Sequence, residues 1–311
     1  MLNDSKIGIF LMAHGAPDNV DHIPQYIRNI RGGQDPSPGI VEAITDHYNQ
    51  IGGKSPLEPI ARGQAKSLEK LLNSNGNEDR FRVYIGMRNW SPYITDVVKK
   101  AYSDGVERLI GICLAPQYSR FSTELYLKAF KEAICKNGGD LKKADFIYSW
   151  ADNEYLAEAF ADRYRQAAKK IIADGATGFY TLFTVHSIPA SSLDEGDPYP
   201  EEFTKTVRSI IKNVKPIQWN QCYQSAGYIP VPWLEPSVEM MLDKIARFGK
   251  KAVLVVPVGF LCDHVEILYD IDIEYKKYAE NKGLKLYRTK SLNATPKLVQ
   301  ALASVIWSHI C

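Results

Sequence analysis

Short apolar runs rich in β-branched residues alternate along this chain with longer segments whose apolar residues recur at helical spacing. The alternation predicts an α/β fold, in which parallel sheets are covered by helices on both faces. Ligands of such folds bind at the carboxyl ends of the strands. The expected strands are Ile7–Met12, Arg82–Gly86, Arg108–Leu114, Phe146–Tyr148, Phe179–Val185, Ala252–Val258 and Leu284–Tyr287. The expected helices are Ile40–Ile51, Ile60–Asn73, Ile94–Asp104, Thr123–Lys136, Asn153–Ala173, Glu201–Asn213, Val238–Arg247, Val265–Lys282 and Pro296–His309.

Two strands that are far apart in the sequence end in similar residues. The first strand is followed by His14-Gly15-Ala16-Pro17, and a strand near the middle by His186-Ser187-Ile188-Pro189. A chain of 311 residues also accommodates two domains of about 150 residues each. We therefore predict two similar Rossmann-like domains facing each other across a cleft. They comprise residues 1–150 and 151–311, with the last helix able to pack back on the first domain.

Charge and cysteine usage argue against several classes of protein. Lys and Arg (38) barely exceed Asp and Glu (36), so nothing suggests a nucleic-acid or anionic-membrane partner. The cysteines are scattered without a CxxC pair, which argues against a disulfide framework, a zinc site or an iron–sulfur cluster; they are Cys113, Cys135, Cys222, Cys262 and Cys311. No glycine-rich phosphate loop follows a strand, which counts against dinucleotide or nucleoside-triphosphate use.

The sequence carries no membrane signal. The apolar stretch Ile7–Met12 is too short for the core of a signal peptide, and no run of about 18 apolar residues occurs. We expect a soluble, cytoplasmic, monomeric protein.

An acidic row stands out near the end of the chain. On a helix over Val265–Lys282, the carboxylates of Glu266, Asp270 and Glu274 would fall on one face. Such a row is either a solvated acidic face or a place where carboxylates bind a divalent cation or relay protons. In the second case their mutual repulsion would raise their proton affinity.

His186 and His14 each follow an apolar strand. Each is either a structural histidine or a group that accepts a proton or ligates a metal near neutral pH. A third, basic and hydroxylic group lies in the first half, with Arg31, His47-Tyr48 and Lys54-Ser55. Arg31, Lys54 and Ser55 suit a carboxylate-bearing ligand, although the Gly-Gly-Lys-Ser-Pro segment also suits a surface turn.

These residues belong to a longer series of ordered motifs that resembles the ferrochelatases along almost the whole chain. The resemblance is strongest to the soluble Gram-positive type that uses coproporphyrin III. The matching segments are Leu11–Pro17, Ile30–Gly33, Tyr48 with Ile51–Leu57, Leu114–Ser119, Phe121-Ser122 with Tyr126, His186–Pro189, Gly196–Pro200, Tyr223–Gly227, Pro232–Leu234, and Pro257–Phe260 through Asp263–Glu266 to Asp270.

The resemblance implies two Rossmann-like domains around a porphyrin cleft. It implies that His186 and Glu266 form the iron site and act as catalytic groups. It assigns porphyrin or propionate contacts to Arg31, Tyr48, Ser55 and Tyr126, and a proton or metal relay to Asp270 and Glu274. Ferrous iron would be a substrate, a porphyrin the partner and haem the product, with no permanently bound cofactor and no iron–sulfur cluster.

Two positions depart from the family pattern. His14 stands where the coproporphyrin type usually has a tyrosine that approaches the metal, and its imidazole could take the same axial role. His47 stands where arginine is more frequent, which would weaken propionate binding.

In the mechanism that we expect, a neutral His186 accepts a pyrrole proton or binds iron, with Glu266 as partner base and ligand. The segment Gln34–Pro38 is short and polar where membrane-associated enzymes often carry an apolar lip, which favours coproporphyrin III. Protoporphyrin IX is the alternative substrate, and a non-catalytic haem or porphyrin carrier is the alternative from another class.

Overall fold

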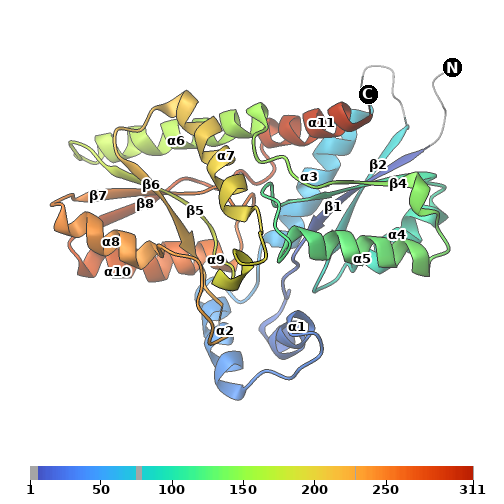
Figure 1. The fold of residues 1–311 in the computed structure, drawn as a ribbon, viewed down its shortest axis with the longest axis horizontal. Helices are drawn as coiled ribbons and strands as arrows, with labels where there is room; N and C mark the ends of the chain where they lie inside the picture. Colours follow the sequence, from blue (N-terminus) through green and yellow to red (C-terminus); the bar gives the residue numbers. More distant parts are fainter. Residues whose placement is uncertain (1–5, 75–78, 228, 311) are drawn as a thin grey trace. The chain divides into compact units, whose positions relative to one another are not determined.

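The computed structural model describes residues 6–74, 79–227 and 229–310 (Figure 1). These residues form two compact units. The first comprises residues up to Trp150 together with those from Asn293 onward, and the second comprises Ala151–Leu292. Each unit contains one four-stranded sheet, and each is described by itself.

The first unit has a parallel sheet in the order β2-β1-β3-β4. Its strands are β1 (Ile7–Ala13), β2 (Phe81–Met87), β3 (Arg108–Cys113) and β4 (Ala144–Ile147). Its helices are α1 (Ile23–Ile30), α2 (Pro38–Gln50), α3 (Leu57–Leu72), α4 (Ile94–Ser103), α5 (Thr123–Lys136) and α11 (Pro296–Ile310). Every residue of β1 is buried, because strands pair with both of its edges and helices cover both faces of the sheet.

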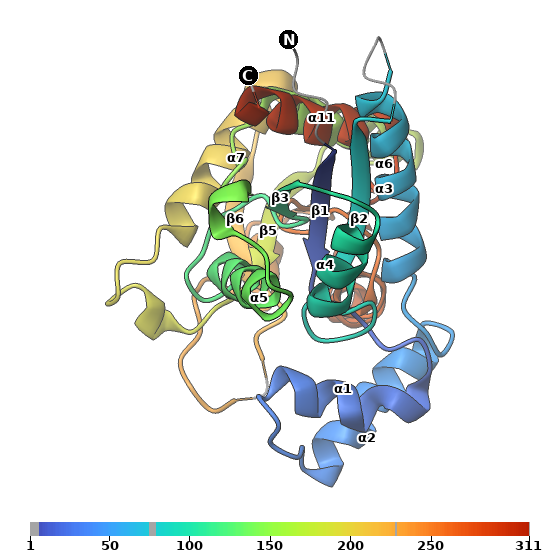
Figure 2. The same cartoon turned by 90° about the vertical axis from the view of Figure 1, so that its right-hand side faces the viewer.

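Helices cover both faces of this sheet, as the turned view shows (Figure 2). Phe10 of β1 packs against Tyr84 and Phe130 on the face covered by α4 and α5, with ring centroids 5.2 and 5.0 Å apart. The opposite face is covered by α3 and α11 (Figures 1 and 2). There the rings of Phe81 and Trp307 meet edge to face at 5.2 Å.

The second unit repeats the same parallel strand order, as β6-β5-β7-β8. Its strands are β5 (Tyr180–His186), β6 (Trp219–Gln224), β7 (Ala252–Pro257) and β8 (Lys285–Arg288). Its helices are α6 (Glu154–Ala173), α7 (Tyr199–Val214), α8 (Val238–Arg247), α9 (Val265–Leu268), a π-helix (Asp270–Tyr275) and α10 (Lys276–Asn281). Helices α8 and α10 close one face and α6 and α7 the other (Figure 1). Strands β1 and β5 occupy the same position in their sheets, which accounts for the similarity between His14–Pro17 and His186–Pro189.

Each expected strand lies in a strand of the structure, with shifts of one or two residues at the ends. Helix α1 and strand β6 were not predicted. The sequence of β6, Trp-Asn-Gln-Cys-Tyr-Gln, has no apolar run, because this edge strand buries only its alternate residues Cys222 and Gln224.

The long helix predicted over Val265–Lys282 is wrong as a continuous α-helix. It is broken into α9, the π-helix and α10. Within the π-helix the amide of Glu274 donates to the carbonyl of Tyr269, five residues earlier, at 3.0 Å. The α-helix is interrupted because this turn contains one extra residue, which gives it π-helical hydrogen bonds. The spacing of the carboxylates in the sequence does not reveal that extra residue.

The chain returns to the first unit before its last helix. Residues from Asn293 onward group with the first unit, whereas the sequence analysis assigned residues 151–311 to the second domain and allowed the last helix to pack back. Gln64 of α3 donates to the carbonyl of Asn293 at 2.9 Å, which ties this return to α3. Across the three described stretches of chain, no helix combines the length and apolarity needed to cross a bilayer. Cys311, one of the cysteines considered above, lies outside the described residues.

Candidate active site

His186 lies at the carboxyl end of β5, a central strand of the second sheet. The hydroxyl of Tyr199 donates to the His186 carbonyl at 3.0 Å, and the next amide, Ser187 N–H, donates to Gln224 at 2.7 Å. The imidazole Nδ1 contacts the carbonyl oxygen of Ser187. Because a carbonyl oxygen only accepts hydrogen bonds, Nδ1 carries a proton and Nε2 is the nitrogen offered to a ligand.

Glu266 reaches the same place from the turn that follows β7. Gly259 in this turn donates its amide to Thr184 at 3.2 Å. A Cβ at Gly259 would lie only 3.0–3.1 Å from atoms of Val185, so only glycine lets the turn approach β5 this closely. The turn leads into α9, whose second residue is Glu266.

Two side chains fix the backbone of Glu266. The Gln224 amide donates to the Glu266 carbonyl at 3.0 Å, and Thr184 holds that amide by donating to its oxygen at 2.7 Å. His264 caps α9, because its Nδ1 accepts from the Glu266 amide at 3.2 Å. Burial lowers the pKa of His264, which keeps the imidazole neutral and able to accept this hydrogen bond.

The Nε2 atom of His186 lies 3.6 Å from the Oε1 atom of Glu266, and each side chain is 35% exposed. Desolvation opposes the charged imidazole, but the Glu266 carboxylate more than offsets it and raises the pKa of His186 to about 9. Without a metal, the pair is therefore an imidazolium–carboxylate ion pair at neutral pH. This differs from the neutral imidazole that the sequence analysis expected, because the strength of the charge coupling depends on the tertiary distance.

Asp270 extends the site along the π-helix. The Ser225 hydroxyl donates to an Asp270 carboxylate oxygen at 2.5 Å, and the Ser225 amide donates to the hydroxyl of Tyr275 at 3.0 Å. Burial, together with the charge of Glu266, raises the pKa of Asp270 to about 7. Burial and the nearby Glu239 also raise the pKa of Glu274. Asp270 thus exchanges protons close to neutral pH, as a relay requires.

The His186–Glu266 pair has a geometry that one cation could bridge. Metal–nitrogen and metal–oxygen bonds of about 2.0–2.2 Å allow an ion to touch two donors up to roughly 4 Å apart, and the separation here is 3.6 Å. Within the described part of the chain, no group of three or more His, Cys, Asp or Glu side chains is arranged to hold a metal ion.

His14, which follows β1 in the first unit, has both ring nitrogens engaged. Its Nδ1 lies 2.9 Å from the Tyr26 hydroxyl and 3.3 Å from the Gly15 carbonyl, so Nδ1 carries the proton. Its Nε2 lies 2.9 Å from the side-chain amide of Asn89. The side chain is exposed. An axial role for His14 would require Nε2 to exchange Asn89 for the metal.

The remaining predicted porphyrin contacts also lie in the first unit. Arg31 ends α1, and its Nε is buried with no hydrogen-bond partner among the residues that the structure describes. Burial lowers the pKa of His47 on α2, so its imidazole is mostly neutral at neutral pH. Tyr48 and Tyr126 are buried. Ser55 is also buried, and its hydroxyl accepts from the Leu57 amide at 3.2 Å.

The predicted residues thus form two groups. His186, Glu266, Asp270 and Glu274 are brought together in the second unit by β5, α9 and the π-helix. His14, Arg31, His47, Tyr48, Ser55 and Tyr126 belong to the first unit. The contact roles of this second group stay predictions.

Comparison with known proteins decides the family. The model of the family described as ferrochelatase matches residues 6–310. The chain belongs to the ferrochelatase family. Membership makes it an enzyme that inserts a metal into a porphyrin in haem biosynthesis, with ferrous iron as substrate and haem as product.

Curated relatives cover nearly the full length of this ferrochelatase. A ferrochelatase of Acidobacterium capsulatum is 38% identical and aligns over 99% of this chain and 95% of its own. Coproporphyrin III ferrochelatases of Listeria monocytogenes and Bacillus subtilis are 36% and 34% identical, over 97% and 98% of both chains. Among solved structures, the sirohydrochlorin chelatase SirB from Bacillus subtilis has a TM-score of 0.59 at 10% identity, covering 97% of this chain and 94% of its own. At that identity SirB shares the fold, and the likeness confirms the predicted two-domain chelatase-like architecture.

Sequence reasoning missed the structural role of most residues that support His186, Glu266, Asp270 and His14 in this ferrochelatase. Four of them, Tyr199, Gln224, Ser225 and His264, were quoted within matching motifs without a role, and Asn89 was not named. The signal that could have revealed them is a polar side chain at a buried position. Gln224 and Asn89 are 1% and 4% exposed, and a buried amide needs hydrogen-bond partners.

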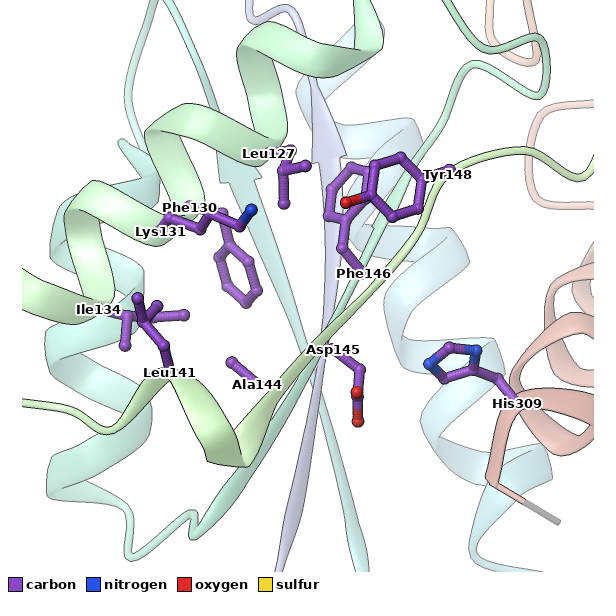
Figure 3. Close-up of a pocket in the computed structure, with 10 residues that line it drawn as sticks. All are labelled: Leu127, Phe130, Lys131, Ile134, Leu141, Ala144, Asp145, Phe146, Tyr148 and His309. Atoms are coloured by element: carbon purple, nitrogen blue, oxygen red, sulfur yellow. The ribbon is translucent and has the colours of Figure 1, made fainter.

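A cavity of about 300 Å³ lies elsewhere, in the first unit (Figure 3). Its apolar wall comes from α5 and β4, with Phe130 and Phe146 among the lining residues, while Lys131, Asp145 and His309 add charge or polarity. None of the predicted site residues lines it.

Proposed function

We propose that this ferrochelatase inserts ferrous iron into coproporphyrin III, with His186 and Glu266 receiving the iron and then the pyrrole protons. The observation that carries the catalytic assignment is the 3.6 Å separation between the imidazole Nε2 and the carboxylate Oε1 at the end of β5. The choice of coproporphyrin is supported by relatives named for that substrate that align over 97–98% of this chain.

The raised pKa of His186 gives the pair a defined order of proton movements. Binding of Fe²⁺ to Nε2 requires the imidazolium to release one proton, which Asp270 can accept because its pKa lies near 7. When iron passes to the porphyrin, the vacated Nε2 and carboxylate accept the two pyrrole protons. The second proton then leaves Glu266 through Asp270 and Glu274. Two protons are released for each iron inserted, as the conversion of a free-base porphyrin to its iron(II) complex requires.

The high proton affinity of the pair also supplies a driving force. A pyrrole N–H is a weak acid, so its proton needs an acceptor of high affinity beside it. A histidine whose pKa is about 9 is a stronger base than an ordinary imidazole once the metal has left. In this proposal the iron keeps Nε2 free of a proton until the moment of transfer.

Arg31 supports a propionate-bearing substrate. A buried guanidinium nitrogen without a partner is costly, and a carboxylate offers it a charge-assisted hydrogen bond. We assign propionate binding to Arg31, with His47 as a weaker neighbour on α2. Tyr48, Ser55 and Tyr126 complete the proposed porphyrin contacts, and His14 is the proposed axial group on the first unit.

A direct competition between porphyrins tests the substrate. Under anaerobic conditions with Fe²⁺, we expect kcat/KM to be at least about 10-fold higher for coproporphyrin III than for protoporphyrin IX, because one charged contact of about 1.4 kcal/mol changes a rate tenfold. Both porphyrins should be assayed in the same detergent, so that aggregation of protoporphyrin does not distort the comparison. A preference for protoporphyrin IX would contradict the substrate assignment, and tight haem binding without turnover of either porphyrin would favour the carrier function instead.

Zinc insertion should occur as a side reaction. Nitrogen and oxygen donors bind zinc at least as well as ferrous iron, so a His–Glu pair has no chemical means of excluding zinc. We expect zinc coproporphyrin to form under the same conditions, detected by its fluorescence. The Glu266→Gln variant is the matched control, because it should lose zinc and iron insertion together. A wild-type enzyme that inserts iron and never zinc would contradict an open two-ligand site.

A further inference from the structure

Arg288, the last residue of β8, contacts two acidic residues, Asp263 and Asp272, that lie on either side of Glu266 in the sequence. Its side chain is 13% exposed. Its Nε and one terminal nitrogen donate to the two carboxylate oxygens of Asp272 at 2.8 and 2.7 Å, a bidentate contact. Its other terminal nitrogen donates to the Thr289 carbonyl at 3.0 Å and lies 3.4 Å from Asp263. All three guanidinium nitrogens are therefore engaged.

The two acidic partners of Arg288 lie before and after Glu266 and Asp270 in the sequence. Asp263 immediately precedes His264, the residue that caps α9 and so orients Glu266. It also accepts from the Ser291 hydroxyl at 2.7 Å. Asp272 lies within the π-helix, two residues after Asp270. One guanidinium thus connects the start of α9 to the π-helix.

The π-helix needs such a connection. A run of i−5 hydrogen bonds is rare and is kept only where the surrounding structure supports it. Here Ser225, the residue after the edge strand β6, donates to Asp270, and Arg288 of the opposite edge strand, β8, donates to Asp272. The π-helix is thus held by side-chain contacts at two of its residues, Asp270 and Asp272.

We propose that Arg288 is a positioning residue for metal insertion. It sets the π-helical register of residues 270–275 and the start of α9, and through them the placement of Asp270 and Glu266 beside His186. This inference rests on the proposed function, because it concerns the same catalytic groups. Arg288 acts through Asp272 and Asp263 rather than on the substrate.

The decisive variants are Arg288→Lys and Asp272→Asn. Lysine keeps the charge but loses the planar fork, and asparagine keeps the shape but loses the carboxylate. We expect each variant to fold and to lose kcat by roughly 10–100-fold, the usual range for residues that orient a metal-binding group. The KM for the porphyrin should stay within about twofold, because neither residue is among the porphyrin contacts.

Arg165→Lys is the matched control. Arg165 lies on α6 in the same unit, pairs with Glu158 and Asp162 at 3.0 and 2.9 Å, and is 44% exposed, so its conservative variant should keep wild-type kcat. Hydrogen exchange gives a readout besides activity. In metal-free protein, the backbone amides of residues 270–276 should exchange faster in Arg288→Lys than in wild type. Their exchange rates in Arg165→Lys should equal those of wild type.

The outcomes separate this inference from the proposed function. If wild-type protein inserts iron and both folded variants keep its kcat, Arg288 has no positioning role. A fall in kcat that Arg165→Lys shares, or one accompanied by an equal rise in KM, would also overturn the proposal. If Arg288→Lys does not fold, Asp272→Asn decides alone by the same criteria. If wild-type protein does not insert iron, the proposed function fails, while the exchange measurement still tests whether Arg288 holds the π-helix.

Discussion

His186→Ala should reduce iron insertion by about 10²–10⁴-fold or more, because it removes both the nitrogen donor for iron and the strongest proton acceptor of the site. Porphyrin binding, measured by quenching of porphyrin fluorescence, should remain detectable. The backbone contacts that shape this end of β5 come from Tyr199 and Gln224 and do not need the imidazole. The variant should therefore fold, with an unchanged circular dichroism spectrum.

His309→Ala is the matched control for this variant. His309 lies in α11 of the first unit and is not among the predicted site residues, so its removal should leave insertion at the wild-type rate. Wild-type turnover by purified His186→Ala would refute the assignment of the catalytic histidine. Loss of porphyrin binding together with turnover would show instead that His186 serves mainly to hold the macrocycle.

Glu266→Gln should produce the second large loss, again about 10²–10⁴-fold in kcat. The amide matches the shape of the carboxylate, and the backbone of Glu266 is fixed by Gln224 and His264, so the change removes charge without displacing α9. Iron then loses an oxygen ligand and the pyrrole proton loses its second acceptor. Anaerobic single-turnover absorption spectroscopy measures this loss directly.

The same variant makes a prediction about the pKa of His186. The Glu266 carboxylate raises that pKa to about 9 against the opposing effect of desolvation. Without the carboxylate, the neutral imidazole is favoured and the pKa must fall. Titration of the His186 ring nitrogens by NMR in metal-free protein should show a midpoint near 9 in wild type and a clearly lower one in Glu266→Gln. An exposed-acid control, Glu158→Gln on α6, should leave the midpoint unchanged. An unmoved midpoint in Glu266→Gln would show that the two groups do not form the ion pair described here.

The two losses should not add. His186 and Glu266 share one metal and one pair of protons, so a variant that lacks both should be only slightly slower than either single variant. Additive losses would mean that the two residues act on separate steps.

Local pattern accounts for much of this protein. Apolar runs such as Ile7–Met12 predicted β1, because a strand of a parallel sheet that helices cover on both faces has buried side chains on both faces. The position of His186 followed from the rule that sites form where parallel strands end. The spacing of Glu266, Asp270 and Glu274 predicted that repulsion would raise their proton affinity, and the pKa of Asp270 is raised by burial and by the charges of Glu266 and Glu274.

Other features depend on contacts between residues far apart in the sequence. Strand β6 has too few apolar residues to be visible, yet it supplies Gln224, which holds Glu266 from a position 42 residues away. The protonated state of His186 depends on a 3.6 Å approach of a charge that lies on another element. The π-helix and its contact with Arg288 arise in the same way.

The sequence alone therefore determined the class of fold, the repeat of two sheets and the chemical groups of the site, because periodicity and strand ends are local properties of the chain. The tertiary structure alone decided the charge state of the His186–Glu266 pair and the π-helical register of the segment that follows Glu266. Those properties depend on distances between side chains, and such distances exist only once the sheets and helices have packed.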